Sequence, residues 1–131
     1  MPAVLIKTNV SISEEKKKEI LSEATKIMVE AAHKHEEAVM VLYETVDATM
    51  GNTPDPLAFV EVRSMVGIDH QTNHDVSERI TPLLKETCGV EPDRVYVNFI
   101  RIPETCWGLL GGIATWEAAR RLWVVNSEPV K

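Results

Sequence analysis

The sequence has little cysteine, no long apolar run and a deficit of positive charge. Its two cysteines, Cys88 and Cys106, lie far apart and match neither a zinc-binding nor a redox motif, so we expect two reduced thiols. No run of about 18 apolar residues occurs, which excludes a membrane-spanning helix. The first residues lack the basic and apolar regions of a signal peptide, and a cytoplasmic protein is therefore expected.

The charge balance excludes a further class of partner. With 14 Lys and Arg against 20 Asp and Glu the net charge is −6, which argues against a nucleic-acid partner but leaves room for a local cationic pocket. Hydrophobic residues make up 44% and charged residues 26%, as in an ordinary globular protein. The 131 residues are long enough to bury a sizeable core, so residues 1–131 are expected to form a single domain.

The first part of the chain predicts a strand, a helix and a second strand. Residues 2–8 read as a strand, and Ser11 with Glu14 forms a capping box that opens a helix over about residues 13–32. The apolar run at 38–44 is typical of a strand covered on both faces. The residues at helical spacing that we expect to be buried are Ile20, Leu21, Ala24, Ile27, Met28, Ala31 and Ala32.

The second part repeats this order after a loop at 45–56. A strand over 57–66 is followed by a helix over about 70–88, which Pro82 should kink and Gly89 should cap. A fourth strand spans 94–102. The buried side of this helix is expected to carry Val76, Ile80, Leu83, Leu84 and Cys88.

This order predicts an α+β fold built from tandem β-α-β repeats, one in residues 1–54 and one in residues 55–102. The result is a four-stranded mixed sheet with two helices on one face. The other face is too apolar to meet water, so we expect subunits that pack their sheets around a common axis.

Residues 103–131 form a C-terminal extension. The stretch 107–112 is rich in glycine, but no Lys-Ser/Thr pair follows it, so a phosphate loop is not expected. Thr115 is predicted to cap a short helix in which Trp116 and Trp123 share a face. The tryptophans of this segment are expected to cover a subunit edge rather than to bind a ligand.

Pro2 is the most unusual feature of the sequence. A small second residue favours the removal of Met1, and the chain then begins with a secondary amine at the end of a buried strand. Burial and a nearby cation both lower the pKa of such an amine from its ordinary value of about 7.7–8.0. A free amine near neutral pH suits general-base catalysis. Alternatively, Pro2 is only the first residue of a strand, and if Met1 is retained its nitrogen is an amide and no base.

Several short motifs point to one family. The stretch 92–99 (Pro-Asp-Arg-Val-Tyr-Val-Asn-Phe) is the most specific of them, and Pro2, Lys34, the stretch 55–58 and the stretch 63–65 follow the same pattern in the same order. Over about residues 1–100 the chain resembles the tautomerase superfamily, and within it the macrophage migration inhibitory factor branch.

The resemblance implies a function and a site. It implies a homotrimer with active sites at the subunit interfaces and the keto–enol tautomerisation of an α-keto acid such as phenylpyruvate, with no cofactor and no metal. In this scheme Pro2 is the base, and Lys34 with the backbone N–H of Met65 holds the substrate carboxylate. Tyr96 and Asn98 line the pocket from the neighbouring subunit.

Each of these residues also has a plainer interpretation. Lys34 alone reads as a cation that complements a helix end, Tyr96 as a residue of the core and Asn98 as a polar residue near a strand end. The chain also departs from the family pattern. Residues 57–60 (Leu-Ala-Phe-Val) replace the Cys-x-x-Cys of the vertebrate cytokine, so no thiol–disulfide activity is expected, and residues 103–131 extend beyond the usual ending.

Other functions stay open. A decarboxylase or dehalogenase of the same superfamily would use further arginines, for which Arg63 and Arg101 are the candidates. A cytokine-like protein would bind a receptor, and leaderless secretion would then replace the cytoplasmic location. His70 and His74 lie one helical turn apart, but a metal site is disfavoured because no third ligand is evident.

Overall fold

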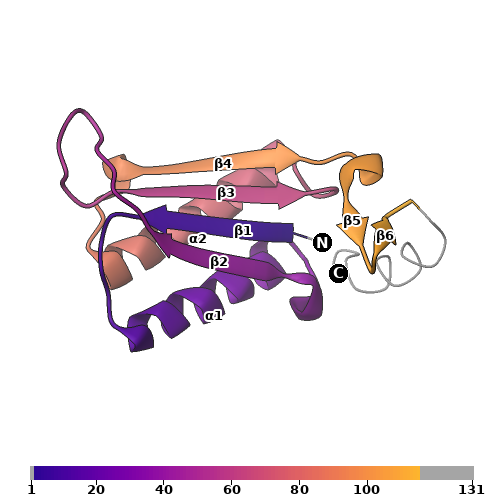
Figure 1. The fold of residues 1–131 in the computed structure, drawn as a ribbon, viewed down its shortest axis with the longest axis horizontal. Coiled ribbons are helices and arrows are strands. Elements are labelled where there is room, and N and C mark those ends of the chain that lie inside the picture. Colours follow the sequence, from indigo (N-terminus) through magenta and orange to yellow (C-terminus); the bar gives the residue numbers. More distant parts are fainter. Residues whose placement is uncertain (1, 116–131) are drawn as a thin grey trace.

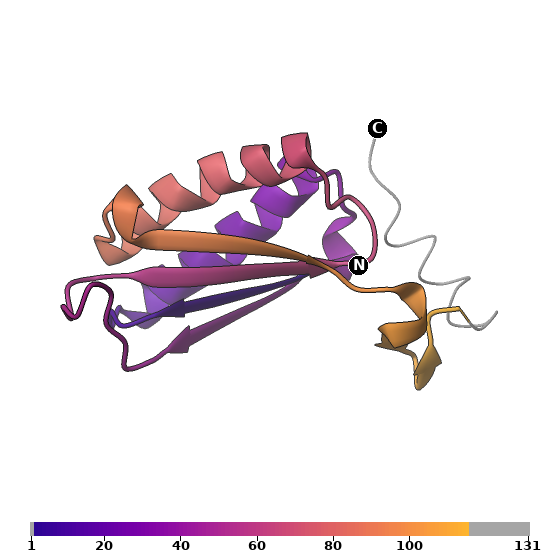
Figure 2. The ribbon, with the colours of Figure 1, turned by 90° about the horizontal axis from the view of Figure 1, so that it is seen from above.

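A four-stranded mixed sheet with two helices on one face makes up most of the chain (Figure 1, Figure 2). The computed structural model describes residues 2–115. Strands pair in the order β2-β1-β3-β4, and the central pair β1–β3 is antiparallel while the two outer pairs are parallel. The elements are β1 (Pro2–Thr8), α1 (Glu14–Ala31), β2 (Met40–Thr45), β3 (Ala58–Ser64), α2 (His70–Cys88) and β4 (Val95–Arg101).

This arrangement confirms the predicted fold. Each β-α-β unit contributes two parallel strands and one helix, and the two units meet through β1 and β3. The helix over 70–88 has the predicted bounds, and its expected buried residues are all buried. Gly89 caps it with φ +68° and donates its N–H to the carbonyls of Leu84 and Lys85. The left-handed conformation explains why glycine stands there.

The start of α1 differs from the prediction. Ser13, not Ser11, is the N-cap, and its Oγ accepts a hydrogen bond from the N–H of Lys16 at 3.2 Å. Glu14 is therefore the first helical residue and complements the helix dipole instead of closing a capping box with Ser11. Leu21 was also expected to be buried, but it is 36% exposed because it lies at the margin of the apolar face.

The core fills the space between the sheet and the helices. Strand residues that alternate along β1 and β3 point toward the helices and are buried, as in Val4, Ile6, Val60 and Val62. They pack against Ile20, Ala24, Ile27, Met28, Val76, Ile80 and Leu84 of the two helices. No helix of residues 2–115 is long and apolar enough to cross a membrane.

The opposite face of the sheet carries exposed apolar side chains. Met40 and Leu42 of β2 are 60% and 48% exposed, and Tyr96 of β4 is 60% exposed. The expectation that the strand over 38–44 is covered on both faces is thus not met within one chain. Ala38 belongs to the 3₁₀ helix η1 (Glu36–Ala38), so β2 begins two residues later than predicted. The face that β2 leaves open is the one for which we predict packing between subunits.

Two further short helices and a hairpin add to the predicted elements: η2 precedes β4, and η3 and the hairpin follow it. The 3₁₀ helices are η2 (Pro92–Arg94) and η3 (Glu104–Cys106), and the small hairpin consists of β5 (Gly108–Leu109) and β6 (Gly112–Ile113). The turn of the hairpin holds Leu110 at φ +55° and Gly111 at φ +80°. The helix predicted after Thr115 lies outside the described residues.

Arg94 holds the loop between β2 and β3. Its Nε donates to the carbonyl of Pro56 at 2.9 Å. Its terminal nitrogens donate to the carbonyls of Met50, Thr53 and Asp55 at 3.0 to 3.3 Å. One side chain thus satisfies four carbonyls of a twelve-residue connection that has no regular structure of its own beyond the Met50–Thr53 bridge.

We expect Arg94→Ala to lower the free energy of unfolding by about 1–3 kcal/mol, because the charge-assisted hydrogen bonds that hold this loop are lost and the carbonyl of Pro56 loses the one donor it has in residues 2–115. Urea unfolding measures this change. Arg79→Ala is the matched control, because within residues 2–115 Arg79 makes an exposed ion pair with Glu30 and no other salt bridge, and such a pair contributes less than about 1 kcal/mol. Equal losses for the two variants would contradict the role of Arg94.

Candidate active site

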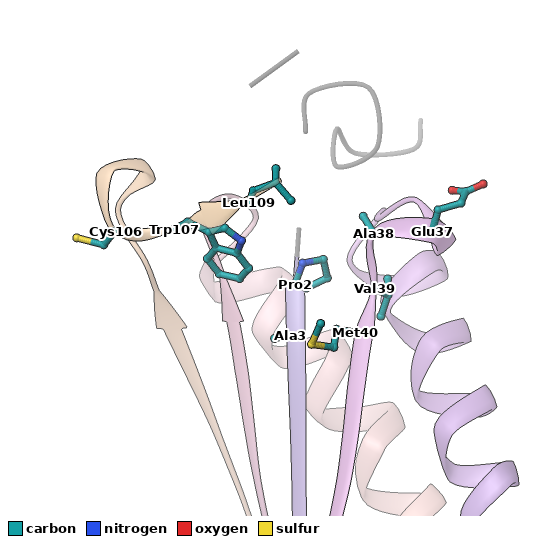
Figure 3. A pocket seen from close by; sticks show the side chains of 10 residues that line it. Pro2, Ala3, Glu37, Ala38, Val39, Met40, Cys106, Trp107 and Leu109 are labelled. Atoms are coloured by element: carbon teal, nitrogen blue, oxygen red, sulfur yellow. The ribbon is translucent and has the colours of Figure 1, made fainter. Parts of the chain in front are cut away.

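A cavity of about 660 Å³ lies at the end of the sheet where β1 begins (Figure 3). Its volume is within the range of pockets that hold small organic ligands. Three segments far apart in the sequence form it: the start of β1, the segment from η1 into β2, and the β5–β6 hairpin region. The lining residues are Pro2, Ala3, Glu37, Ala38, Val39, Met40, Cys106, Trp107, Gly108 and Leu109.

Pro2 is part of the wall of this cavity. It is the first residue of β1 and is buried, and its cross-strand partner is Ser64 of β3. Along β1 the buried positions are Pro2, Val4, Ile6 and Thr8, so the proline ring lies on the helix side of the sheet. Figure 3 shows the ring between Trp107 on one side and Val39 on the other. The walls around this ring are therefore mainly apolar, which favours the uncharged form of an amine.

Lys34 is a buried cation behind this site. His33 turns the chain at the end of α1 with φ +57°, and the N–H of Lys34 donates to the carbonyl of Met28 at 3.1 Å. The side chain is 1% exposed, and its Nζ donates to the carbonyl of Val66 at 2.9 Å. Burial lowers the pKa of Lys34 from its ordinary value. Within residues 2–115 no carboxylate lies within 4 Å of Lys34 to offset this cost.

A hydrogen-bond link joins Lys34 to the strand opposite Pro2. Ser64 donates its hydroxyl to the same Val66 carbonyl at 2.7 Å, and Ser64 is the cross-strand partner of Pro2. Lys34 itself lines a separate small cavity and not the one around Pro2. Gly67 makes this packing feasible, because at φ +77° a Cβ would lie only 3.1 Å from the Lys34 Nζ.

The other predicted site residues lie outside the cavity. Met65 is 5% exposed and packs with Ala114, and Trp107 and Leu109 of the cavity wall pack against this pair. Tyr96 and Asn98 lie on β4, with side chains on the open face of the sheet, and both are exposed. One chain therefore brings Lys34 and Met65 close behind the cavity but keeps Tyr96 and Asn98 away from Pro2.

The comparisons with known proteins agree with this fold. A sequence model of the macrophage migration inhibitory factor family matches residues 1–115. The chain belongs to this family. The rat protein (Rattus norvegicus) named macrophage migration inhibitory factor is 32% identical over 104 residues, which cover 76% of this chain and 86% of the rat protein.

Solved structures extend the likeness. The crystal structure of a macrophage migration inhibitory factor-like protein from Entamoeba histolytica has a TM-score of 0.82 at 28% identity and covers 86% of this chain and 97% of its own. A protein inactivated by 2-oxo-3-pentynoate has a TM-score of 0.78 at 21% identity, over 92% of this chain and 98% of its own, and shares the fold. The family match reaches residue 115 and so includes the hairpin that walls the cavity.

In this member of the family, sequence reasoning missed most of the cavity wall. Trp107 was assigned to a subunit edge, yet it faces Pro2 across the cavity (Figure 3). The sequence signal for the hairpin is the two-residue turn Leu110–Gly111. It is hard to recognise, because Leu110 stands at a position of positive φ where asparagine or glycine is the usual residue. Glu37 and Val39 were missed because the 3₁₀ turn at 36–38 follows no periodic pattern.

The arginines and histidines considered for other functions do not line the cavity. Nε and Nη2 of Arg63 both donate to Oε2 of Glu61, at 3.2 and 2.7 Å. Within residues 2–115, neither Arg63 nor Arg101 lines the cavity. His74 pairs with Glu78 at 3.0 Å. Within the described range no three side chains of His, Cys, Asp or Glu come together as metal ligands would.

Proposed function

We propose that this chain is a cofactor-independent keto–enol tautomerase of phenylpyruvate-like α-keto acids, with the nitrogen of Pro2 as its general base. The observation that carries the proposal is the position of Pro2: a buried proline at the start of β1 that lines a cavity of about 660 Å³. The role requires the removal of Met1, because only a chain-terminal nitrogen has a free electron pair. Membership of the family supports it.

The reaction needs one base and a set of hydrogen-bond donors. The base removes a proton from the carbon next to the ketone, at a distance of about 3 Å. The electron pair of that C–H bond forms the C=C bond of the enol, and negative charge develops on the ketone oxygen, which then takes up a proton. Donors that already point at this oxygen lower the barrier. In the reverse direction Pro2 returns its proton to carbon.

Lys34 and Met65 have the proposed task of holding the substrate carboxylate. An ammonium group has three N–H donors, and the one hydrogen bond that the Lys34 Nζ makes in residues 2–115 is to the carbonyl of Val66. The remaining donors and the backbone N–H of Met65 would bind the carboxylate. The positive charge would also disfavour protonation of Pro2, which keeps the base active.

Tyr96 and Asn98 have their proposed role in a second copy of the chain. Their exposure on the open sheet face, together with Met40 and Leu42, supports a homotrimer in which this face is covered and the site is completed by a neighbour. The Asn98 amide offers a donor and an acceptor, so it would follow the ketone oxygen through keto and enol forms.

A complementation experiment tests the shared site. Pro2→Gly subunits are mixed and refolded with subunits that carry Tyr96→Ala and Asn98→Ala. In random trimers about one quarter of the interfaces combine an intact Pro2 with an intact Tyr96–Asn98 pair. We therefore expect the mixture to recover about a quarter of the wild-type rate with phenylpyruvate, although each variant alone is nearly inactive. A rate equal to the mean of the two parents would contradict a site formed by two subunits.

A further inference from the structure

Among the described residues, Glu37 is the one carboxylate in the wall of the cavity around Pro2. Apart from Glu37 and Cys106, the described residues that line the cavity are apolar. Glu37 belongs to η1 and is exposed, and no basic side chain of the described range lies within 4 Å of it. Figure 3 shows Glu37 on the η1 side of the cavity, across from Trp107, with its carboxylate turned away from the Pro2 ring.

The position of Pro2 orients any substrate in this cavity. The reacting carbon must lie within about 3 Å of the Pro2 nitrogen, so the rest of the molecule extends across the cavity, between the wall of Trp107 and Leu109 and the wall of Val39 and Met40. These walls suit an aromatic or aliphatic tail. A tail that points toward η1 brings a group at its far end to the side of the cavity that Glu37 lines.

We infer that Glu37 sets the specificity for the distal end of the substrate: it disfavours a second acidic group and favours a neutral or cationic one. This inference rests on the proposed tautomerase function. Two like charges several ångströms apart repel each other, and a partly enclosed cavity screens them less than bulk water does. The preferred class is therefore a monoacidic 2-oxo acid with an apolar tail, ending in a hydrogen-bond donor or an amine rather than in a carboxylate.

The test compares three substrates: phenylpyruvate, its 4-carboxy derivative and its 4-aminomethyl derivative. In the wild type we expect kcat/KM to fall in the order aminomethyl, unsubstituted, carboxy. Glu37→Gln should raise the ratio of kcat/KM for the carboxy substrate to that for phenylpyruvate by about 3- to 30-fold. This range corresponds to the repulsion of two unit charges about 8 Å apart, with an effective dielectric constant between that of a protein surface and that of bulk water. The effect should shrink at high salt.

Glu36→Gln is the matched control, because Glu36 lies next to Glu37 in η1 and is exposed but does not line the cavity. If phenylpyruvate is converted but Glu37→Gln shifts the ratio no more than Glu36→Gln does, the role of Glu37 is wrong while the proposed function stands. If phenylpyruvate is not converted by wild-type chain that begins at Pro2, the proposed function fails. Binding of cinnamate and 4-carboxycinnamate, measured by calorimetry, then tests Glu37 without turnover: the same shift in affinity ratio supports its role, and no shift overturns it.

Discussion

An alanine inserted between Met1 and Pro2 is expected to lower kcat/KM for phenylpyruvate by about 10²- to 10⁴-fold, the usual contribution of a general base. The insertion turns the Pro2 nitrogen into an amide, whose electron pair is delocalised into the carbonyl, while the proline ring and the cavity walls stay the same. Pro2→Gly, which keeps a terminal amine without the ring, is expected to lose activity as well.

Mass spectrometry must verify the first residue of each protein, because retained Met1 would silence the wild type in the same way. Circular dichroism and thermal unfolding serve as folding controls. The cavity lies at the margin of the sheet, so the insertion should leave the core between the sheet and the helices intact. If the insertion variant converts phenylpyruvate as fast as the verified wild type does, Pro2 is not the base.

The second large effect is expected for Lys34→Met, which should separate activity from stability. Loss of a charge-assisted bond to the substrate carboxylate is expected to lower kcat/KM by about 10- to 100-fold, mainly through KM. Stability should stay the same or rise, because a buried ammonium without a carboxylate partner in residues 2–115 is removed. The carbonyl of Val66 still accepts the hydroxyl of Ser64.

Lys18→Met is the control for this comparison, because Lys18 is exposed on α1. It should leave both kcat/KM and the free energy of unfolding close to the wild-type values. If enough of the Lys34→Met protein is unfolded under the assay conditions to account for its loss of activity, the role of Lys34 in substrate binding is contradicted.

The lowered pKa of Lys34 also predicts a pH dependence. Since burial disfavours the charged form, the folded chain releases this proton at a lower pH than the unfolded chain does. The unfolded state therefore binds more protons between the two pKa values, and the contribution of Lys34 to stability rises with pH across that window. In the rate profile, the alkaline limb of kcat/KM should fall at a pH below that of an ordinary lysine. This limb should be absent in Lys34→Met.

The sequence predicted the regular elements better than the site. The helix predicted over about 70–88 has these bounds in the structure because the apolar stripe and Gly89 mark its course and its end, and the structure adds Asp69 as the N-cap, which the prediction did not name. The start of α1 was wrong because Ser11 and Ser13 both precede acidic residues, and only the backbone geometry selects Ser13. Local spacing decides a helix, but it does not choose between two equivalent caps.

The cavity was harder to predict because it joins segments that periodicity does not connect. Pro2, Val39 and Trp107 come from three parts of the chain, and only the register of the sheet and the return of the hairpin bring them together. The resemblance supplied the roles of Lys34 and Tyr96. Whether Tyr96 reaches Pro2 depends on a second subunit, which one chain does not contain, so its role stays a prediction.

The most direct test of the account is the protonation of the Pro2 nitrogen itself. The protein is produced with ¹⁵N-labelled proline, its first residue is verified, and the chemical shift of the terminal nitrogen is followed by NMR as the pH is changed. We predict a pKa below the range of ordinary α-amino groups, and a rise toward that range in Lys34→Met. A terminal nitrogen that titrates at or above the ordinary range in the wild type would contradict the proposal that it acts as a base near neutral pH.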